Sequence, residues 1–189
     1  SDDNQTITNA DMALYDNSVS ADEDIFFEVD INNDLTIPAP ASSTFSDQEL
    51  SIKGGNTYQP DSLSSGNVTA PNITLASGSI LTADGNTITL TGSGTPLVVS
   101  GTFNEGASTI IYTGSSATNV ASTTYYNLKV NQTGTTFTGI GSTTVKSVFT
   151  IQAGTFNASN TTITLSGTGT PFVILGNFAY ATSTIKYAS

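Results

Sequence analysis

Two stretches of this chain carry nearly the same sequence, the first beginning at residue 87 and the second at residue 162. Residues 87–103 read TITLTGSGTPLVVSGTF, and residues 162–178 read TITLSGTGTPFVILGNF. The likeness continues downstream at the same spacing, where STIIY at residues 108–112 returns as STIKY at residues 183–187. Because a repeated sequence usually encodes a repeated structural unit, the fold has to accommodate two copies of one module.

Each copy is built from short strands separated by glycine-rich turns. In the Thr-Ile-Thr-Leu segments at residues 87–90 and 162–165, aliphatic side chains alternate with threonine, which is typical of a strand with one apolar face. Further short apolar segments, divided by Gly, Ser, Asn and Thr, lie at residues 73–75, 80–81, 97–99, 110–112, 125–130 and 148–151. Many short strands at regular spacing predict an all-β fold.

Three features favour a parallel β-solenoid (β-helix) for this all-β body. The glycine-rich turns would serve as the corners of a coil, and the alternating strands would turn aliphatic side chains inward and threonine outward. The spacing from residue 87 to residue 162 fits three or four coils of roughly 20 residues each. The alternative is a pair of tandem β-sandwich modules, although the spacing between the copies is short for a sandwich of about 100 residues.

The N-terminal region has a different texture. Residues 1–50 hold 12 of the 15 acidic residues, and IFFEVDIN at residues 25–32 alternates from Phe27 onward like a half-buried strand. Residues 35–37 form a second short apolar segment before a proline. We expect an extended acidic arm or cap with short strands over residues 1–50, a turn-rich junction over 51–66, and the solenoid body over 67–189.

Composition excludes several classes of function. With 15 acidic residues, four Lys, and no Arg or His, the net charge is −11, which argues against nucleic-acid binding. No stretch approaches the roughly 20 apolar residues needed to insert into a membrane. Without His or Cys, the usual zinc ligands and the common nucleophile systems are missing. Because residues 67–189 contain only two acids, Asp84 and Glu105, we expect no catalytic residue and no enzyme activity.

One candidate metal site lies in the N-terminal region. Asp30, Asn32 and Asp34 alternate like the first oxygen ligands of a calcium loop. The segment lacks the glycine and the distant glutamate of such a loop, so an Asx-rich turn is the competing interpretation. No other cofactor is expected.

The repeat motifs resemble those of a known group of proteins. The Gly-Thr-Phe-Asn segments at residues 101–104 and 154–157, the Thr-Ile-Thr-Leu strands and the Ser-Gly-Thr-Gly-Thr-Pro corner are similar to Thr/Gly/Asn-rich repeats of exported bacterial surface proteins. These belong to the broad parallel β-helix, adhesin-like group. Over residues 67–189 the resemblance implies a secreted or cell-surface location and a structural or adhesive role.

Two apolar runs, at residues 97–99 and 172–175, do not alternate. A strand with two apolar faces is expected to be covered on both, so the arm or another chain would lie over them. The second copy also leaves its last coil with an unpaired strand edge, which templates association.

We therefore expect an extracellular structural protein, a subunit that pairs with itself in a filament or surface layer through strand addition and end-to-end stacking. The expected interface residues are Phe26, Phe27, Val29 and Ile31 in the arm, and Val173, Leu175, Ile185 and Tyr187 on the acceptor side. The alternative function is an adhesin segment that binds surface glycans.

Overall fold

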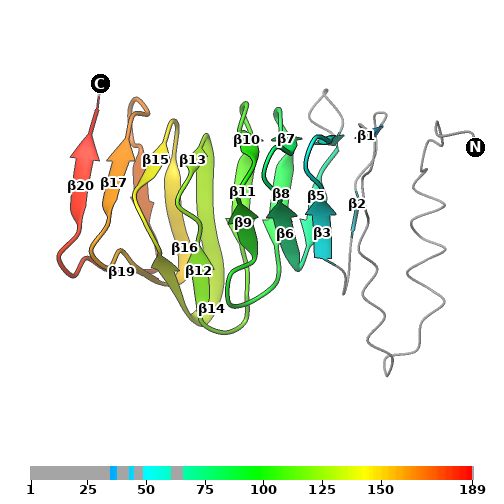
Figure 1. Cartoon of the computed structure of the whole chain (residues 1–189). Helices are drawn as coiled ribbons and strands as arrows, with labels where there is room; N and C mark the ends of the chain where they lie inside the picture. The colour runs from blue at the N-terminus through cyan, green and yellow to red at the C-terminus, as the bar shows by residue number, and fades with distance from the viewer. Residues whose placement is uncertain (1–34, 38–42, 45–48, 61–65, 189) are drawn as a thin grey trace, which may run out of the picture.

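The computed structural model describes residues 35–37, 43–44, 49–60 and 66–188. These residues form twenty strands and no helix. Every strand pair that they form is parallel, and strands from successive coils lie side by side along one axis (Figure 1). The chain is therefore a parallel β-solenoid, as the sequence predicts. The facing antiparallel sheets of the alternative sandwich fold do not occur in the described part of the chain.

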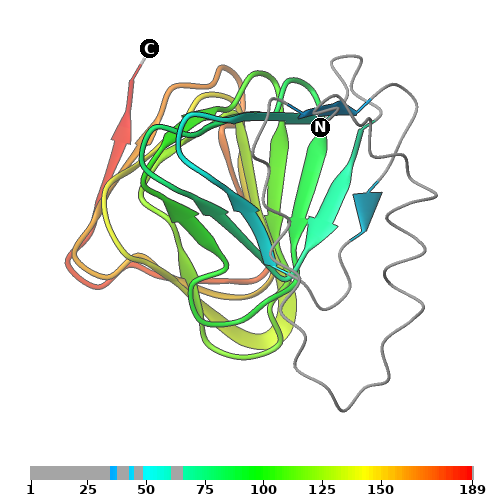
Figure 2. The same ribbon diagram turned by 45° about the vertical axis from the view of Figure 1, so that its right-hand side comes forward.

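Four parallel sheets form the walls and surround a single interior (Figure 2). The longest sheet has the order β2 (Ser43–Thr44), β5 (Val68–Ala70), β8 (Thr87–Leu90), β11 (Thr109–Tyr112), β14 (Asn127–Gly139), β16 (Phe149–Asn157) and β18 (Phe172–Ile174), with β12 (Thr118–Val120) on β14 and β19 (Asn177–Ala179) on β16. The other walls are β1 (Leu35–Ile37), β4 (Thr57–Pro60), β7 (Ile80–Thr82) and β10 (Thr102–Asn104); β3 (Glu49–Ile52), β6 (Asn72–Leu75) and β9 (Leu97–Val99); and β13 (Thr124–Tyr125), β15 (Thr143–Val145), β17 (Thr162–Leu165) and β20 (Thr184–Tyr187).

Alternation along each strand explains why the coils stack. On the longest sheet one row of paired inward positions runs through five successive coils, and each of its side chains is at most 1% exposed: Val68, Ile88, Ile110, Leu128 and Phe149. Full burial of an aliphatic or aromatic side chain contributes about 1.5–3 kcal/mol. The neighbouring row, which faces outward, includes Thr69, Thr89 and Thr150. The inward rows thus form one continuous core along the axis.

The two sequence copies lie on different walls of the solenoid. From β8, three turns along the longest sheet lead through β11 and β14 to β16, and the second copy starts at the next strand, β17. The two copies are therefore separated by three complete turns and the step from one wall to the next. Coil length is close to the expected value but not constant. The turn from Ile110 to its partner Leu128 contains fewer residues than the turn from Ile73 to its partner Leu97.

Although they lie on different walls, the copies repeat the same local backbone geometry. Gly94 and Gly169 both have a φ of 74°, a conformation that favours glycine, in open space at a corner. A Cβ on Gly92 or Gly167 would collide with a backbone carbonyl of the preceding coil. The repeat therefore encodes a strand and its corner, and the same geometry is used on two different walls.

Residue 67 is the predicted start of the solenoid body, and the parallel strand pairing also includes strands on its N-terminal side. Strand β3 pairs with β6, β4 pairs with β7, and β1 pairs with β4. Leu50 and Ile52 on β3 are completely buried. The turn-rich residues 53–56 form one corner of the coil, closed by a hydrogen bond from Asn56 N–H to the Lys53 carbonyl at 3.2 Å.

A buried pair of tyrosines fills the core between β11 and β13. The hydroxyl groups of Tyr112 and Tyr125 lie 2.8 Å apart, and both rings are fully buried. Ala121 N–H donates to the Tyr112 hydroxyl at 3.2 Å, and the Tyr125 hydroxyl donates to the Ala121 carbonyl at 2.9 Å. Burial raises the pKa of Tyr112 to about 12 and raises the pKa of Tyr125 as well, because ionised oxygens are poorly solvated there.

Candidate functional site

The last coil of the described chain has neighbours on one side only. Strands β18 and β19 pair with β16, and β20 pairs with β17, while no described strand pairs with their other edges. An unpaired strand edge presents backbone N–H and C=O groups in a row, ready to receive another strand. In Figure 1 this coil, ending at β20, forms one end of the stack.

The inward positions of this coil form an apolar surface, which we call the end surface: Phe172, Ile174, Phe178, Ile185 and Tyr187. Each is paired with a residue that is at most 2% exposed in the preceding coil: Phe149, Ile151, Phe156, Ile163 and Leu165. In the last coil the same positions are uncovered on one side, so Ile174 is 46% exposed and Tyr187 is 65% exposed. The end surface is thus a cross-section of the core.

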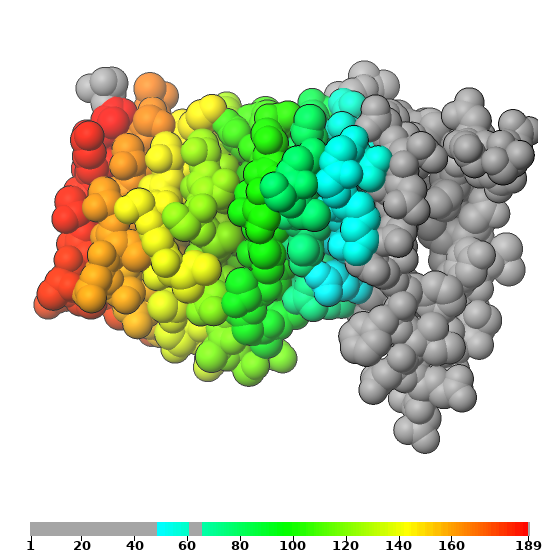
Figure 3. Space-filling view, in the orientation of Figure 1, coloured from blue at the N-terminus to red at the C-terminus, as the bar shows by residue number. Residues whose placement is uncertain are grey.

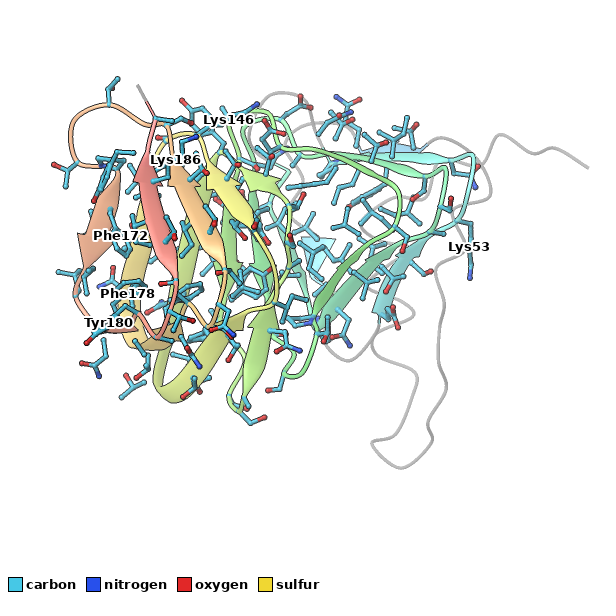
Figure 4. The ribbon with its side chains drawn as sticks, turned by 60° about the vertical axis from the view of Figure 1, so that its left-hand side comes forward. Lys53, Lys146, Phe172, Phe178, Tyr180 and Lys186 are labelled. Atoms are coloured by element: carbon cyan, nitrogen blue, oxygen red, sulfur yellow. The ribbon has the colours of Figure 1, made fainter. Side chains whose placement is uncertain are left out.

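Phe172 and Phe178, labelled in Figure 4, are the outermost rings of two stacked phenylalanine pairs in the core. The ring of Phe172 stacks on Phe149 with centroids 5.2 Å apart, and Phe178 stacks on Phe156 with centroids 6.4 Å apart. Phe172 and Phe178 meet edge to face at 5.2 Å. These contacts hold the two outermost rings against the preceding coil and against each other.

Charge is distributed unevenly along the sequence. Residues 1–105 contain all 15 acidic residues and one lysine, whereas residues 106–189 contain three lysines and no acid. The described coils follow one another as side-by-side bands in chain order (Figure 3), so the described acids Glu49, Asp84 and Glu105 precede Lys129, Lys146 and Lys186 along the stack. Lys146 and Lys186 lie toward the end surface and Lys53 lies toward the opposite end (Figure 4). The end surface therefore belongs to the positively charged half of the chain.

The expected acceptor residues all lie in the last coil, but in different orientations. Ile185 and Tyr187 belong to the end surface. Val173 pairs with Thr150 in the outward row of β18, and Leu175 follows β18 at a corner, 65% exposed. The expected arm residues, Phe26, Phe27, Val29 and Ile31, lie outside the described residues, as do the calcium candidates Asp30, Asn32 and Asp34.

Sequence reasoning missed Phe172, Ile174 and Phe178. Residues 172–175 are consecutive apolar residues, so their pattern does not reveal which side chains point inward. The register with Phe149 and Ile151 settles this, because these partners are buried. For Phe178, the sequence does offer a signal, because the residue aligns with Phe103 in the first copy of the repeat.

The apolar run in the first copy is not covered by any described residue on its outer side. Val98, in the middle of β9, points outward and is 39% exposed, while Leu97 is buried. The expectation that both faces of this strand are covered is therefore not met within the described part of the chain. Leu97 and Val99 are the core-facing residues, and Val98 is a single exposed aliphatic side chain on the lateral wall.

The two acids of the repeat body are already engaged with other side chains. Gln59 Nε2 donates to Asp84 Oδ2 at 2.7 Å, and Lys146 forms an ion pair with Glu105. Partial burial alone would raise the pKa of the Glu105 carboxyl, but the hydrogen bond and charge of Lys146 outweigh this and lower its pKa. Both carboxylates thus tie different coils together.

A shallow polar groove of about 430 Å³ is lined by β14, by β16 and by the turn from β18 into β19. Its polar side chains include Thr133, Thr136, Gln152 and Asn177, and Leu175 contributes the apolar part. Gly134 and Gly154, with φ of 79° and 78°, shape the bends of the two strands here. The groove offers hydrogen-bonding groups without charge.

Comparisons with protein-family models, curated proteins and solved structures found no significant match to the chain. The described residues contain no helix long and apolar enough to cross a membrane. They also contain no cluster of three or more side chains of the kinds that hold metal ions. The fold defines the class of protein, a parallel β-solenoid, and the end surface is its most distinctive chemical feature.

Proposed function

We propose that this chain is an extracellular structural protein, a subunit that assembles end to end into a filament or surface layer. The observation that supports the proposal is the end surface, where core positions and three strand edges are open in one coil. Covering it would bury aromatic and aliphatic side chains and pair backbone groups at the same time. The lack of cysteine and the abundance of Thr and Ser are compatible with an exported protein.

The geometry of a solenoid favours open rather than closed assemblies. The two ends of the stack are different surfaces, so a contact between one end and the other is heterologous. Heterologous contacts that do not close into a ring propagate as fibres. The charge distribution favours this head-to-tail arrangement, because the acidic half of one copy attracts the lysine-containing half of the next.

The test compares two aliphatic-to-lysine variants of the full chain. Ile174→Lys places a charge in the end surface, and Val98→Lys places the same charge on the lateral wall at a similarly exposed position, 46% and 39% respectively. A concentration series followed by sedimentation velocity and electron microscopy measures assembly. We expect wild type and Val98→Lys to assemble, and Ile174→Lys to need at least about tenfold more protein, because it buries an unpaired charge.

Two results would count against the proposal. One is a wild-type chain that stays monomeric throughout the concentration series. The other is assembly that Val98→Lys abolishes and Ile174→Lys leaves intact, which would locate the contact on the lateral wall. Circular dichroism of each variant establishes that the β-structure is retained.

The alternative proposal, an adhesin segment, is supported by the polar corner groove. Its threonine, glutamine and asparagine side chains match the hydroxyl groups of a neutral glycan. A glycan array probed with the labelled chain tests this, with Gln152→Ala as the variant. Selective binding that this variant loses would favour the adhesin, and absence of selective binding would remove it.

A further inference from the structure

The last coil has three strands with an open edge, and one of these edges fits a particular segment of the chain. We propose that β20 accepts residues 27–31 of a second copy as an added parallel strand, with an acidic side chain of that segment beside Lys186. This inference rests on the proposed function and specifies which segment makes the contact.

Strand β20 has the longest regular edge in the last coil. Its four residues, Thr184–Tyr187, alternate between outward and inward positions, while β18 and β19 have three residues each. Ile185 and Tyr187 point toward the core and Lys186 points outward, as their pairing with Ile163, Leu165 and Thr164 requires. Lys186 is exposed, and it is the only charged residue in these three strands.

Residues 27–31 have the complementary pattern. Added as an extended strand, residues 27–31 would place Phe27, Val29 and Ile31 on one side and Glu28 and Asp30 on the other. When Val29 pairs with Ile185, the apolar residues continue the core and Asp30 lies beside Lys186. A shift by two residues places Glu28 there instead. Opposite charges on directly neighbouring strands attract each other, so either register gains a favourable pair.

The other two strands offer no such match. The outward position of β18 is Val173, and those of β19 are Asn177 and Ala179, so neither strand presents a cation to an acidic segment. An acidic strand beside them would leave its carboxylates without a partner.

The segment has to come from a different molecule. Ile31 lies four residues before Leu35, which begins β1 at the far end of the stack. Four extended residues reach about 14 Å. From β2 to β18 the longest sheet takes six steps, or about 29 Å at about 4.8 Å per step. Because its own arm cannot reach β20, a second copy must supply the strand.

Charge reversal in the 189-residue chain tests the pairing. Lys186→Glu should raise the concentration needed for assembly about tenfold, since attraction becomes repulsion. Combining it with Glu28→Lys and Asp30→Lys should restore assembly to within about threefold of wild type, and added salt should shrink both effects. Lys129→Glu, in the outward row of the longest sheet away from the last coil, is the matched control and should assemble like wild type.

The outcomes separate this inference from the proposed function. If the wild-type chain does not assemble, the proposed function fails. If it assembles and Ile174→Lys blocks assembly, but Lys186→Glu has no greater effect than Lys129→Glu, the end surface is the interface and the pairing with residues 27–31 is wrong. Loss in Lys186→Glu that the arm reversals do not rescue also overturns the pairing. Rescue by reversed charges supports it.

Discussion

The most informative substitution series follows one row of phenylalanines toward the end surface. Phe137, Phe156 and Phe178 are paired in register on three successive coils. Phe137 is completely buried and Phe156 is 2% exposed, whereas Phe178 is only partly buried because no coil covers it. The same change, Phe→Ala, therefore removes the same atoms from two positions with a coil on both sides and from one position with a coil on one side only.

The expected costs follow from this burial. Phe137→Ala and Phe156→Ala should each lower the free energy of unfolding by about 3–5 kcal/mol, the usual range for a buried phenylalanine. Phe178→Ala should cost about half as much, on the order of 2 kcal/mol, because its ring packs against one neighbouring coil instead of two. At concentrations where the chain assembles, the cost at Phe178 should rise toward that of the other two positions.

Guanidinium denaturation of the dilute chain, followed by circular dichroism and by tyrosine fluorescence, measures these differences. Coincident transitions from the two probes justify a two-state analysis. Equal costs at Phe178 and Phe137 in the dilute chain would refute the reasoning, because they would mean that Phe178 is covered in the monomer.

Three further predictions concern the body of the solenoid. In a tyrosinate absorbance titration, Tyr112 and Tyr125 should ionise at higher pH than exposed tyrosines. The folded pKa of Tyr112, about 12, exceeds its ordinary value of 10, so the free energy of unfolding that this difference adds below pH 10 should be lost between pH 10 and 12. Gly101→Ala should lower the melting temperature, since its Cβ would lie 2.6 Å from the Ala76 carbonyl oxygen; an unchanged value would refute that contact. Glu105→Gln should reduce the loss of unfolding free energy as pH falls below about 4.5. Lys146 lowers the pKa of the Glu105 carboxyl, so the ionised carboxylate stabilises the fold only above that range. Urea titrations that show the same loss of unfolding free energy at acid pH in the variant and in wild type would contradict this.

Much of the fold is readable from the sequence, because in this chain alternation and turn chemistry agree. The Thr-Ile-Thr-Leu segments predict which side chains are inside, and Ile88, Leu90, Ile163 and Leu165 are indeed buried. The glycine-rich segments predict corners, and Gly94 and Gly169 adopt the positive φ that such corners require. Local rules of this kind operate within a few residues, so they are visible in the sequence.

What the sequence does not reveal depends on register between coils. Coil length varies from turn to turn, so the spacing between the two copies cannot indicate that they lie on different walls. Uniformly apolar runs hide orientation, and for this reason the sequence does not predict Phe172 and Ile174 at the end surface, whereas it does suggest Val173. Residues 51–66 resemble a junction in the sequence because Gly, Pro, Ser and Asn are frequent there, yet β4 (Thr57–Pro60) pairs with β7 in the ladder.

The central claim is that copies of this chain stack along the solenoid axis, and X-ray diffraction from aligned assemblies tests it most directly. Strands in a solenoid run across the axis and are spaced about 4.8 Å apart along it. Stacking through the end surface predicts a reflection at about 4.8 Å parallel to the long direction of the assembly. The same reflection perpendicular to that direction would mean that the copies associate through their lateral walls, and would contradict end-to-end stacking.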